Sequence, residues 1–174
     1  MSNRHGKVAI FIDGANLHAT AKALGIRIDF RRLLAAFAGS GELVRAYYYS
    51  AVPVDFVPIK PLLDWLDYNG FTVVTKPLRA ATDAGDGSKI PGCPDVELAV
   101  DAMTLSTSVE QIIIFSGDGA FCPLVVALQR RGVRVSIVSS IATSPPMVAS
   151  ELRRQADVFL DLNDLNLKQQ PAHR

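Results

Sequence analysis

The sequence is poor in the residues that bind soft metals. Among its 174 residues are two cysteines, Cys93 and Cys122, and three histidines, His5, His18 and His173. The two cysteines lie far apart and form no Cys-x-x-Cys pair, so the ligand spacing of a structural zinc site is missing. We therefore expect no zinc site, and we expect both thiols to be reduced, as is usual in the cytosol.

Long hydrophobic runs are also missing. The N-terminal segment MSNRHGK is polar, and the first apolar run, VAIFI, is short. A membrane-spanning helix needs about 20 apolar residues, and a signal peptide needs an apolar region of about 7 to 15 residues. We therefore expect a soluble, cytoplasmic protein with no membrane partner.

A strong net charge of either sign is absent as well. The chain has 18 Lys and Arg against 17 Asp and Glu, which gives a formal net charge of +1 at pH 7. A polyanion such as RNA would have to be held by a local patch rather than by the whole surface. The composition therefore neither supports nor excludes a nucleic-acid partner.

The sequence does contain enough apolar residues, 49%, for one hydrophobic core. Short β-rich runs alternate with longer helical patterns, which is typical of a mainly parallel sheet covered by helices on both faces. The predicted strands are residues 7–13, 43–51, 71–76, 111–116, 133–139 and 156–162. The predicted helices are residues 15–24, 29–38, 57–69, 94–106, 120–131 and 146–155.

This pattern predicts an α/β protein with one domain over residues 7–165, a flexible N-terminus over 1–6 and a flexible tail over 166–174. Asp29 is expected to cap the second helix. The segment 77–94, rich in glycine, proline and small polar residues, is too long for an ordinary connection. It is either a mobile loop with a function or a disordered surface insertion.

Two aspartates stand at predicted strand ends, beside glycines. The first strand ends in FIDGAN, which contains Asp13 and Asn16, and the fourth ends in FSGDGAF, which contains Asp118. Asp95 begins a predicted helix in GCPDVELAVDAM. Ligands of open α/β sheets bind outside the carboxyl ends of the strands, where these three carboxylates can converge.

Taken singly, Asp95 and Asp13 read as a helix cap and a turn residue. Together, sheltered like charges are costly unless a cation or a proton compensates them, so we favour a metal site. Oxygen ligands without clustered His or Cys suit Mg²⁺ or Mn²⁺, which would orient and deprotonate water for phosphodiester hydrolysis. Asp101 lies about 600° around the helix from Asp95, so we expect a supporting or structural role for it. We expect Glu97 to be solvated.

Three basic residues near the long loop, Lys76, Arg79 and Lys89, are candidate phosphate contacts, or alternatively a solvated loop face. The tyrosine run 47–49 alternates faces in a strand, so we expect it to pack in the protein rather than stack on RNA. An apolar sheet edge could support a homodimer, but nothing in the sequence fixes the oligomeric state.

The chain resembles the NYN domain family, in its LabA-like branch, over nearly all of residues 7–165. The segments that carry the resemblance are FIDGAN, KPLLDWLDYNG, GCPDVELAVDAM, FSGDGAFCPLVVALQRRGVRV and SPPMVASELRRQADVF. The resemblance implies a PIN-like three-layer α/β/α fold and metal-dependent ribonuclease chemistry. It implies that Asp13, Asp95 and Asp118 are acidic metal-binding residues, that Asn16 is the family's amide, and that Ser116 belongs to its Ser-Gly-Asp motif.

The chain departs from the family at two places. The family usually reads Ser-Gly-Asp-x-Asp-Phe, whereas Ala120 stands where the second aspartate belongs. Prolines and a cysteine also interrupt the pattern before Asp95, where Lys89 is a candidate replacement for the family's lysine. We expect the ion site to form from three aspartates, with any second metal held more weakly, since lost support costs about 10 to 100-fold in affinity or activity.

Three explanations of Ala120 stay open: a tolerated change in a one-metal nuclease, a change that leaves an RNA-binding pseudonuclease, or an introduced substitution. The function we favour is a metal-dependent endoribonuclease that hydrolyses single-stranded or structured RNA, with Ser116 and Asn16 among its substrate contacts. The alternative is a catalytically impaired RNA-binding or regulatory protein of the same fold. A dinucleotide site is disfavoured because Gly-x-Gly-x-x-Gly does not follow the first strand.

Overall fold

The computed structural model describes residues 6–39, 41–52, 58–80, 89–90 and 94–167. The strands are β1 (Lys7–Asp13), β2 (Glu42–Val52), β3 (Thr72–Pro77), β4 (Arg79–Ala80), β5 (Lys89–Ile90), β6 (Gln111–Phe115), β7 (Arg134–Ser139) and β8 (Val158–Asp161). The helices are α1 (Gly14–Ala23), α2 (Phe30–Ala38), α3 (Lys60–Tyr68), α4 (Asp95–Leu105), the 3₁₀ turn η1 (Gly119–Phe121), α5 (Cys122–Arg130) and α6 (Ser150–Gln155). Of the predicted flexible ends, residues 1–5 and 168–174 lie outside the described residues.

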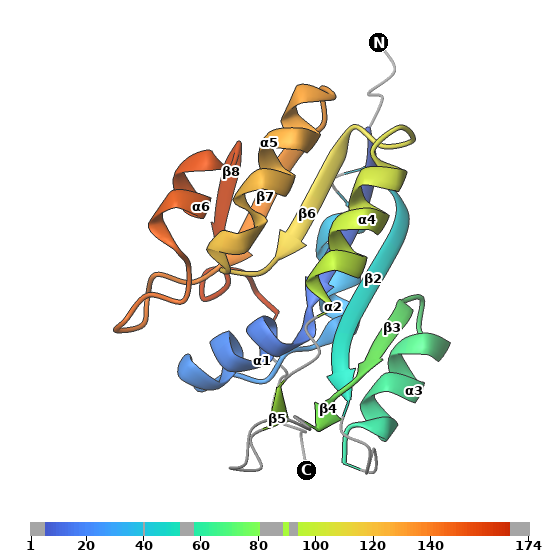
Figure 1. Ribbon diagram of the computed structural model, residues 1–174, viewed down its shortest axis with the longest axis vertical. Helices are drawn as coiled ribbons and strands as arrows, with labels where there is room; N and C mark the ends of the chain where they lie inside the picture. Colours follow the sequence, from blue (N-terminus) through green and yellow to red (C-terminus); the bar gives the residue numbers. More distant parts are fainter. Residues whose placement is uncertain (1–5, 40, 53–57, 81–88, 91–93, 168–174) are drawn as a thin grey trace.

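Six strands form a central sheet in the order β3-β2-β1-β6-β7-β8, and every neighbouring pair is parallel (Figure 1). The chain builds outward from β1 to one edge and then crosses back to β6 to build the other edge. The order therefore reverses between β1 and β6, and in open α/β sheets such a switch point leaves a crevice at the carboxyl ends of the strands.

Helices cover both faces of the sheet, which confirms the predicted three-layer α/β/α architecture. On one face, Leu17 of α1, Leu33 of α2 and Leu66 of α3 are buried in one apolar cluster. On the other face, Leu98 of α4 and Val125 of α5 belong to a second cluster. The strands supply alternate residues to the two clusters, as the pleat of a doubly covered sheet requires.

The tyrosine run packs as the alternation predicts. Tyr47 and Tyr49 lie on the α4 side and stack with Phe11, with ring centroids 5.0 Å and 6.4 Å from that of Phe11. Tyr48 points to the other face and meets Phe30 edge to face. All three tyrosines therefore serve the packing of helices on the sheet.

The structure differs from the sequence prediction at two connections. Within 77–94, β4 and β5 pair as a short antiparallel ladder, while residues 81–88 and 91–93 lie outside the described residues. The last helix begins at Ser150 rather than 146, because the backbone before it is used for other bonds: Met147 N–H donates to Ser140 and Ala149 N–H donates to Gly117.

The helices are short. The longest, α4, has 11 residues, about half the length that spans a bilayer. No helix in the described ranges is both long enough and apolar enough to cross a membrane.

The predicted cap of α2 is confirmed and can be tested. Asp29 Oδ1 accepts hydrogen bonds from the backbone N–H groups of Arg31 and Arg32, at 3.0 Å and 3.1 Å. Asp29→Ala should lower the free energy of unfolding by about 1 kcal/mol, whereas Asp29→Asn keeps an acceptor and should lose much less. Urea unfolding of the two variants measures the difference. Equal losses would show that the charge of Asp29, which lies 3.6 Å from Arg32 Nε, stabilises the helix instead.

Candidate active site

The candidate site is built on the two strands at the switch point. β1 ends at Asp13, and Ile12 pairs with Phe115, so the residue after β6, Ser116, lies level with Asp13. The next residues, Gly117 and Asp118, turn outward from the sheet into η1. Two loops that are far apart in sequence thus meet at one edge of the sheet.

Asp13 is nearly buried, with 9% of its surface exposed. Its Oδ1 accepts a hydrogen bond from the Asn16 backbone N–H at 3.1 Å, which caps α1. Its Oδ2 accepts a hydrogen bond from the Ser116 hydroxyl at 3.0 Å. The carboxylate is therefore held at both oxygens, and each oxygen keeps a lone pair for a further ligand.

Asn16 connects the two strand ends from the first turn of α1. Its Oδ1 accepts a hydrogen bond from the Gly117 backbone N–H at 2.9 Å. The Thr20 hydroxyl donates to the Asn16 carbonyl at 2.8 Å, one helical turn later. The amide oxygen thus positions the turn after β6.

Asp118 is exposed at the mouth of the site. Its backbone N–H donates to the Ser116 hydroxyl at 3.2 Å, and its Oδ1 accepts from the Ala120 N–H at 2.9 Å. The side chain caps the short η1 turn, and Ala120, the middle residue of that turn, is exposed. Ser116 therefore bonds to both aspartate residues, donating to one and accepting from the other.

The charges of two other carboxylates act on Asp13. Burial raises the pKa of the Asp13 carboxyl, and the hydrogen bonds from Asn16 and Ser116 lower it. The negative charges of Asp95 and Asp118 raise this pKa again. Asp95 and Asp118 thus act electrostatically on Asp13, but among the described residues no group of three or more His, Cys, Asp or Glu side chains is placed so that it could hold a metal ion.

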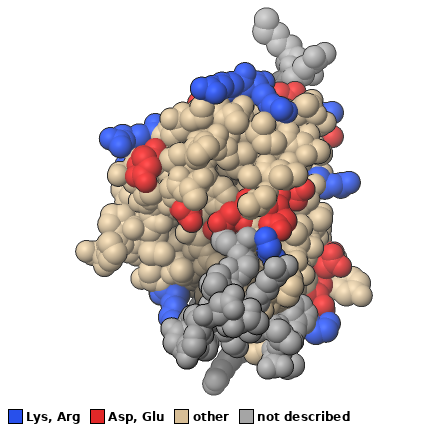
Figure 2. Space-filling view, viewed as in Figure 1, with Lys and Arg blue, Asp and Glu red and all other residues tan. Residues whose placement is uncertain are grey.

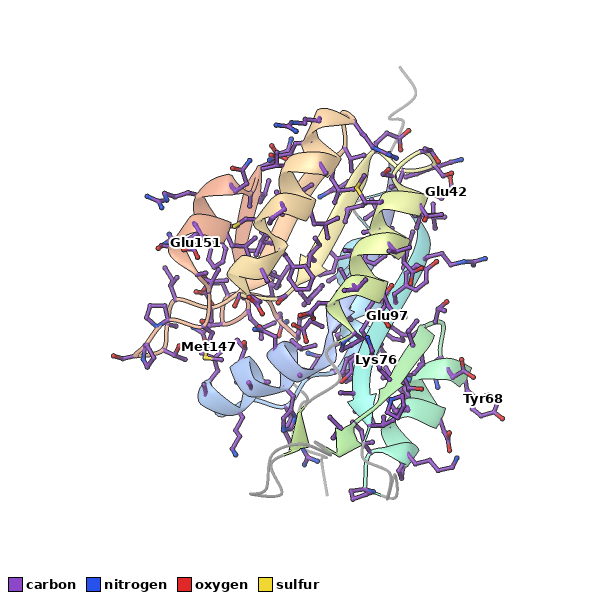
Figure 3. All side chains as sticks on the ribbon, in the orientation of Figure 1. Glu42, Tyr68, Lys76, Glu97, Met147 and Glu151 are labelled. Atoms are coloured by element: carbon purple, nitrogen blue, oxygen red, sulfur yellow. The ribbon has the colours of Figure 1, made fainter. Side chains whose placement is uncertain are left out.

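Two contacts fix α4, and with it Asp95, against the sheet. The Tyr49 hydroxyl donates to Asp101 Oδ2 at 2.8 Å, so this bond ties α4 to β2. Burial and this hydrogen bond raise the pKa of Tyr49, so the phenol stays protonated. In the first turn of α4, Glu97 Oε1 lies 2.8 Å from Lys76 Nζ at the end of β3 (Figure 3).

The structure changes three expectations for these residues. Glu97 is not simply solvated: its hydrogen bond to Lys76 lowers its pKa, so the carboxylate holds a nearby cation. Lys76 is thus engaged with α4. Ser116, expected to contact substrate, is completely buried and bonds to Asp13, so it positions that carboxylate instead. Arg79 and Lys89 lie in β4 and β5, and their side chains lie outside the described residues.

The sequence prediction missed two residues beside the site. Tyr48 lies behind the start of α1, and burial together with the charge of Asp13 raises the pKa of Tyr48 to about 12. Glu151, in the first turn of α6, lies near the turn after β6 (Figure 3), where burial and the charge of Glu151 raise the pKa of Cys122. The order of the sheet gives the signal for Glu151, because α6 follows β7, the neighbour of β6.

Comparison with known proteins gives a consistent result. Residues 7–163 match the sequence profile of the NYN domain. The chain is 33% identical over 169 residues to the low amplitude and bright protein LabA of Synechococcus elongatus, covering 95% of this chain and 88% of that protein. A crystal structure of a protein of unknown function from Vibrio parahaemolyticus superimposes with a TM-score of 0.75 at 24% identity, covering 94% of this chain and 97% of the other. The likeness to the Vibrio parahaemolyticus protein concerns the fold alone.

Gly117 must be glycine because the turn after β6 is packed against the segment before α6. A Cβ at this position would overlap the Met147 carbonyl and lie 2.7 Å from Ser139 Oγ. Gly117→Ala should therefore lower the free energy of unfolding by more than about 2 kcal/mol. Gly39→Ala is the matched control, since its Cβ would meet nothing closer than 3.8 Å, and it should change stability by less than about 1 kcal/mol in urea unfolding. Similar losses in the two variants would contradict the packing.

The raised pKa of Asp13 predicts a pH-dependent effect of Asp13→Asn. A carboxyl with a raised folded-state pKa favours folding when protonated, and this contribution is lost as pH rises through that pKa. In EDTA, Asp13→Asn should therefore gain stability relative to wild type as pH rises above the ordinary pKa of an aspartate, by about 1.4 kcal/mol per pH unit until the raised folded-state pKa is reached. Urea unfolding at several pH values measures the gain. A gain that shrinks as pH rises would refute the predicted sign.

Proposed function

Because this chain belongs to the NYN domain family, we propose that it is a metal-dependent ribonuclease that hydrolyses RNA phosphodiester bonds at the Asp13, Asp95 and Asp118 edge. The observation that supports this most is the buried Asp13 carboxylate at the switch point of the sheet. It lies in the field of two further carboxylates, and the hydrogen bonds that it accepts from the Asn16 N–H and the Ser116 hydroxyl come from neutral groups. Such a cluster favours a cation at neutral pH.

The donor set suits a hard divalent ion. Oxygen ligands are those that Mg²⁺ and Mn²⁺ prefer, and Mg²⁺ commonly takes only one or two carboxylates directly and keeps several waters. Asp13, Asp95 and Asp118 are the residues that would hold it. A bound ion would supply a deprotonated water and would neutralise the charge that grows on the phosphorus.

The chain's own residues prepare this edge before a substrate arrives. Ser116 and the Asn16 backbone N–H fix both oxygens of Asp13, and the Asn16 amide oxygen fixes the turn that carries Asp118. Catalytic groups held in this way lose little freedom when substrate binds, which lowers the barrier to reaction. We assign Ser116 and Asn16 the role of positioning residues.

RNA would reach the site from the side of the β3 to α4 connection. Lys76 lies at the end of β3 beside the first turn of α4, and Arg79 and Lys89 belong to the short ladder that follows. Basic residues at such a place would contact phosphates on either side of the scissile bond. Lys76 would exchange its ion pair with Glu97 for a phosphate, and the three residues would then supply the local positive charge that the net charge of the chain does not.

One observation favours the second candidate, an RNA-binding protein with impaired catalysis. Position 120 presents a methyl group where the family has a carboxylate, and the Ala120 N–H donates to Asp118 Oδ1. One ligand is thus missing and a lone pair of another is engaged. In this case the site would bind RNA and turn it over slowly or not at all.

Cleavage of end-labelled single-stranded RNA in Mn²⁺ or Mg²⁺ tests the proposal. We expect the wild-type chain to cut and Asp13→Asn to lose at least about 100-fold in rate, because the central carboxylate is gone. Ala120→Asp should cut about 10 to 100-fold faster than wild type, because it restores the missing carboxylate. If Ala120→Asp alone cuts, the second candidate is correct.

Two controls make the result interpretable. Asp67→Asn removes an exposed aspartate of α3 and should leave cleavage unchanged. Thermal unfolding should show that Mn²⁺ raises the melting temperature of wild type more than that of Asp13→Asn, since a ligand bound only to the folded state stabilises it. Wild-type cleavage that Asp13→Asn does not reduce would place the active site elsewhere.

A further inference from the structure

An open groove of about 890 Å³ runs along the outer side of α4 and α5. Its sides come from Val96, Val100 and Met103 of α4 and from Leu124 and Ala127 of α5. Val96 is 68% exposed and Val100 is 58% exposed, although both are large apolar residues. Contiguous exposed apolar surface of this kind marks an interaction site.

Helix α4 carries apolar residues on two faces. Leu98 and Ala102 are buried against the sheet. Val96 and Val100 lie four residues apart on the exposed side of the helix, and the half-buried Met103, three residues further on, joins this row to the second apolar cluster. A surface helix needs one apolar stripe, so the second stripe indicates that α4 has a packing partner.

We propose that the groove between α4 and α5 is the interface of a homodimer with two-fold symmetry. A two-fold interface requires one surface that is complementary to itself. Here a ridge formed by Val96 and Val100 lies beside a hollow lined by the small side chains of Ala99 and Ala127. The ridge of each copy fits the hollow of the other when the two α4 helices run antiparallel.

The charges at the two ends of the groove agree with this arrangement. Asp95 stands at one end, and Arg131 stands at the other. Arg131 is held there, because its Nη1 donates to the Met103 carbonyl at 3.2 Å and to Ser106 Oγ at 3.0 Å. Figure 2 shows the same polarity: surface free of charged residues over α4 and α5 separates acidic side chains near the carboxyl edge from basic side chains at the opposite end. Antiparallel pairing brings the Asp95 end of each copy to the partner's Arg131.

The interface also has a consequence for the candidate active site. This consequence rests on the proposed function, whereas the interface itself does not. Asp95 belongs both to the groove and to the carboxylate edge. The partner's Arg131 would therefore lie beside the edge at which RNA phosphates bind. Each copy would supply a guanidinium, a group well suited to phosphate, to the site of the other.

Sedimentation equilibrium of the full chain, without RNA or divalent metal, tests the interface directly. Wild type should be dimeric at about 100 µM, and Val100→Glu should raise the dimer dissociation constant by at least about 30-fold. Tyr68→Glu is the matched control, because Tyr68 of α3 is 88% exposed and lies away from the groove (Figure 3), and it should remain dimeric. Near-ultraviolet circular dichroism confirms that both variants are folded.

A charge exchange tests the antiparallel direction. Arg131→Glu should weaken the dimer by placing two acidic groups together, and adding Asp95→Lys should restore it. A monomeric wild type at about 100 µM, or a Val100→Glu variant that dimerises like wild type, would overturn the proposal. If wild type is monomeric and Val100→Glu binds labelled single-stranded RNA more weakly, the groove belongs to RNA instead.

Discussion

The site depends on two hydrogen bonds that join the ends of β1 and β6. The Ser116 hydroxyl donates to Asp13, and the Gly117 N–H donates to Asn16. The segment after β6 thus supplies both donors, and the segment at the end of β1 supplies both acceptors. Without them a nearly buried carboxylate would lie beside two further negative charges with no donor from the neighbouring strand. The packing of the sheet therefore offsets the repulsion between these carboxylates. A bound cation would reduce the repulsion that remains.

The main elements could be predicted from the sequence because parallel strands covered on both faces read as short apolar runs. The run before Asp13 and the run before Ser116 are nearly continuous in isoleucine, valine and phenylalanine, and both are strands. Their ends could be predicted to meet at one edge because the carboxyl ends of parallel strands do so, which makes that edge a candidate site. The tyrosine run could be assigned to packing for a similar reason, since alternation along a strand is a local property.

The remaining features of the site could not be predicted, because they are contacts between residues that lie far apart in the sequence. The pairing of Lys76 with Glu97 follows from the placement of α4 across the end of β3. The burial of Ser116 follows from its place between two strand ends, and the nearness of Glu151 to Cys122 follows from the order of β6 and β7. The ladder of β4 and β5 has two residues in each strand, too few for any periodicity to show.

The switch point also decides when in folding the site can exist. β1 pairs with β2 on one side and with β6 on the other, and the hydroxyl that holds Asp13 lies 103 residues further along the chain. The N-terminal half can form β1, β2 and β3 with comparatively local contacts, but it contains neither Ser116 nor Asp118. Contacts of such long sequence separation form late because the entropy of closing a long loop must be met first. An incompletely synthesised or partly unfolded chain therefore has no assembled carboxylate edge, and any activity of that edge appears only with the finished domain.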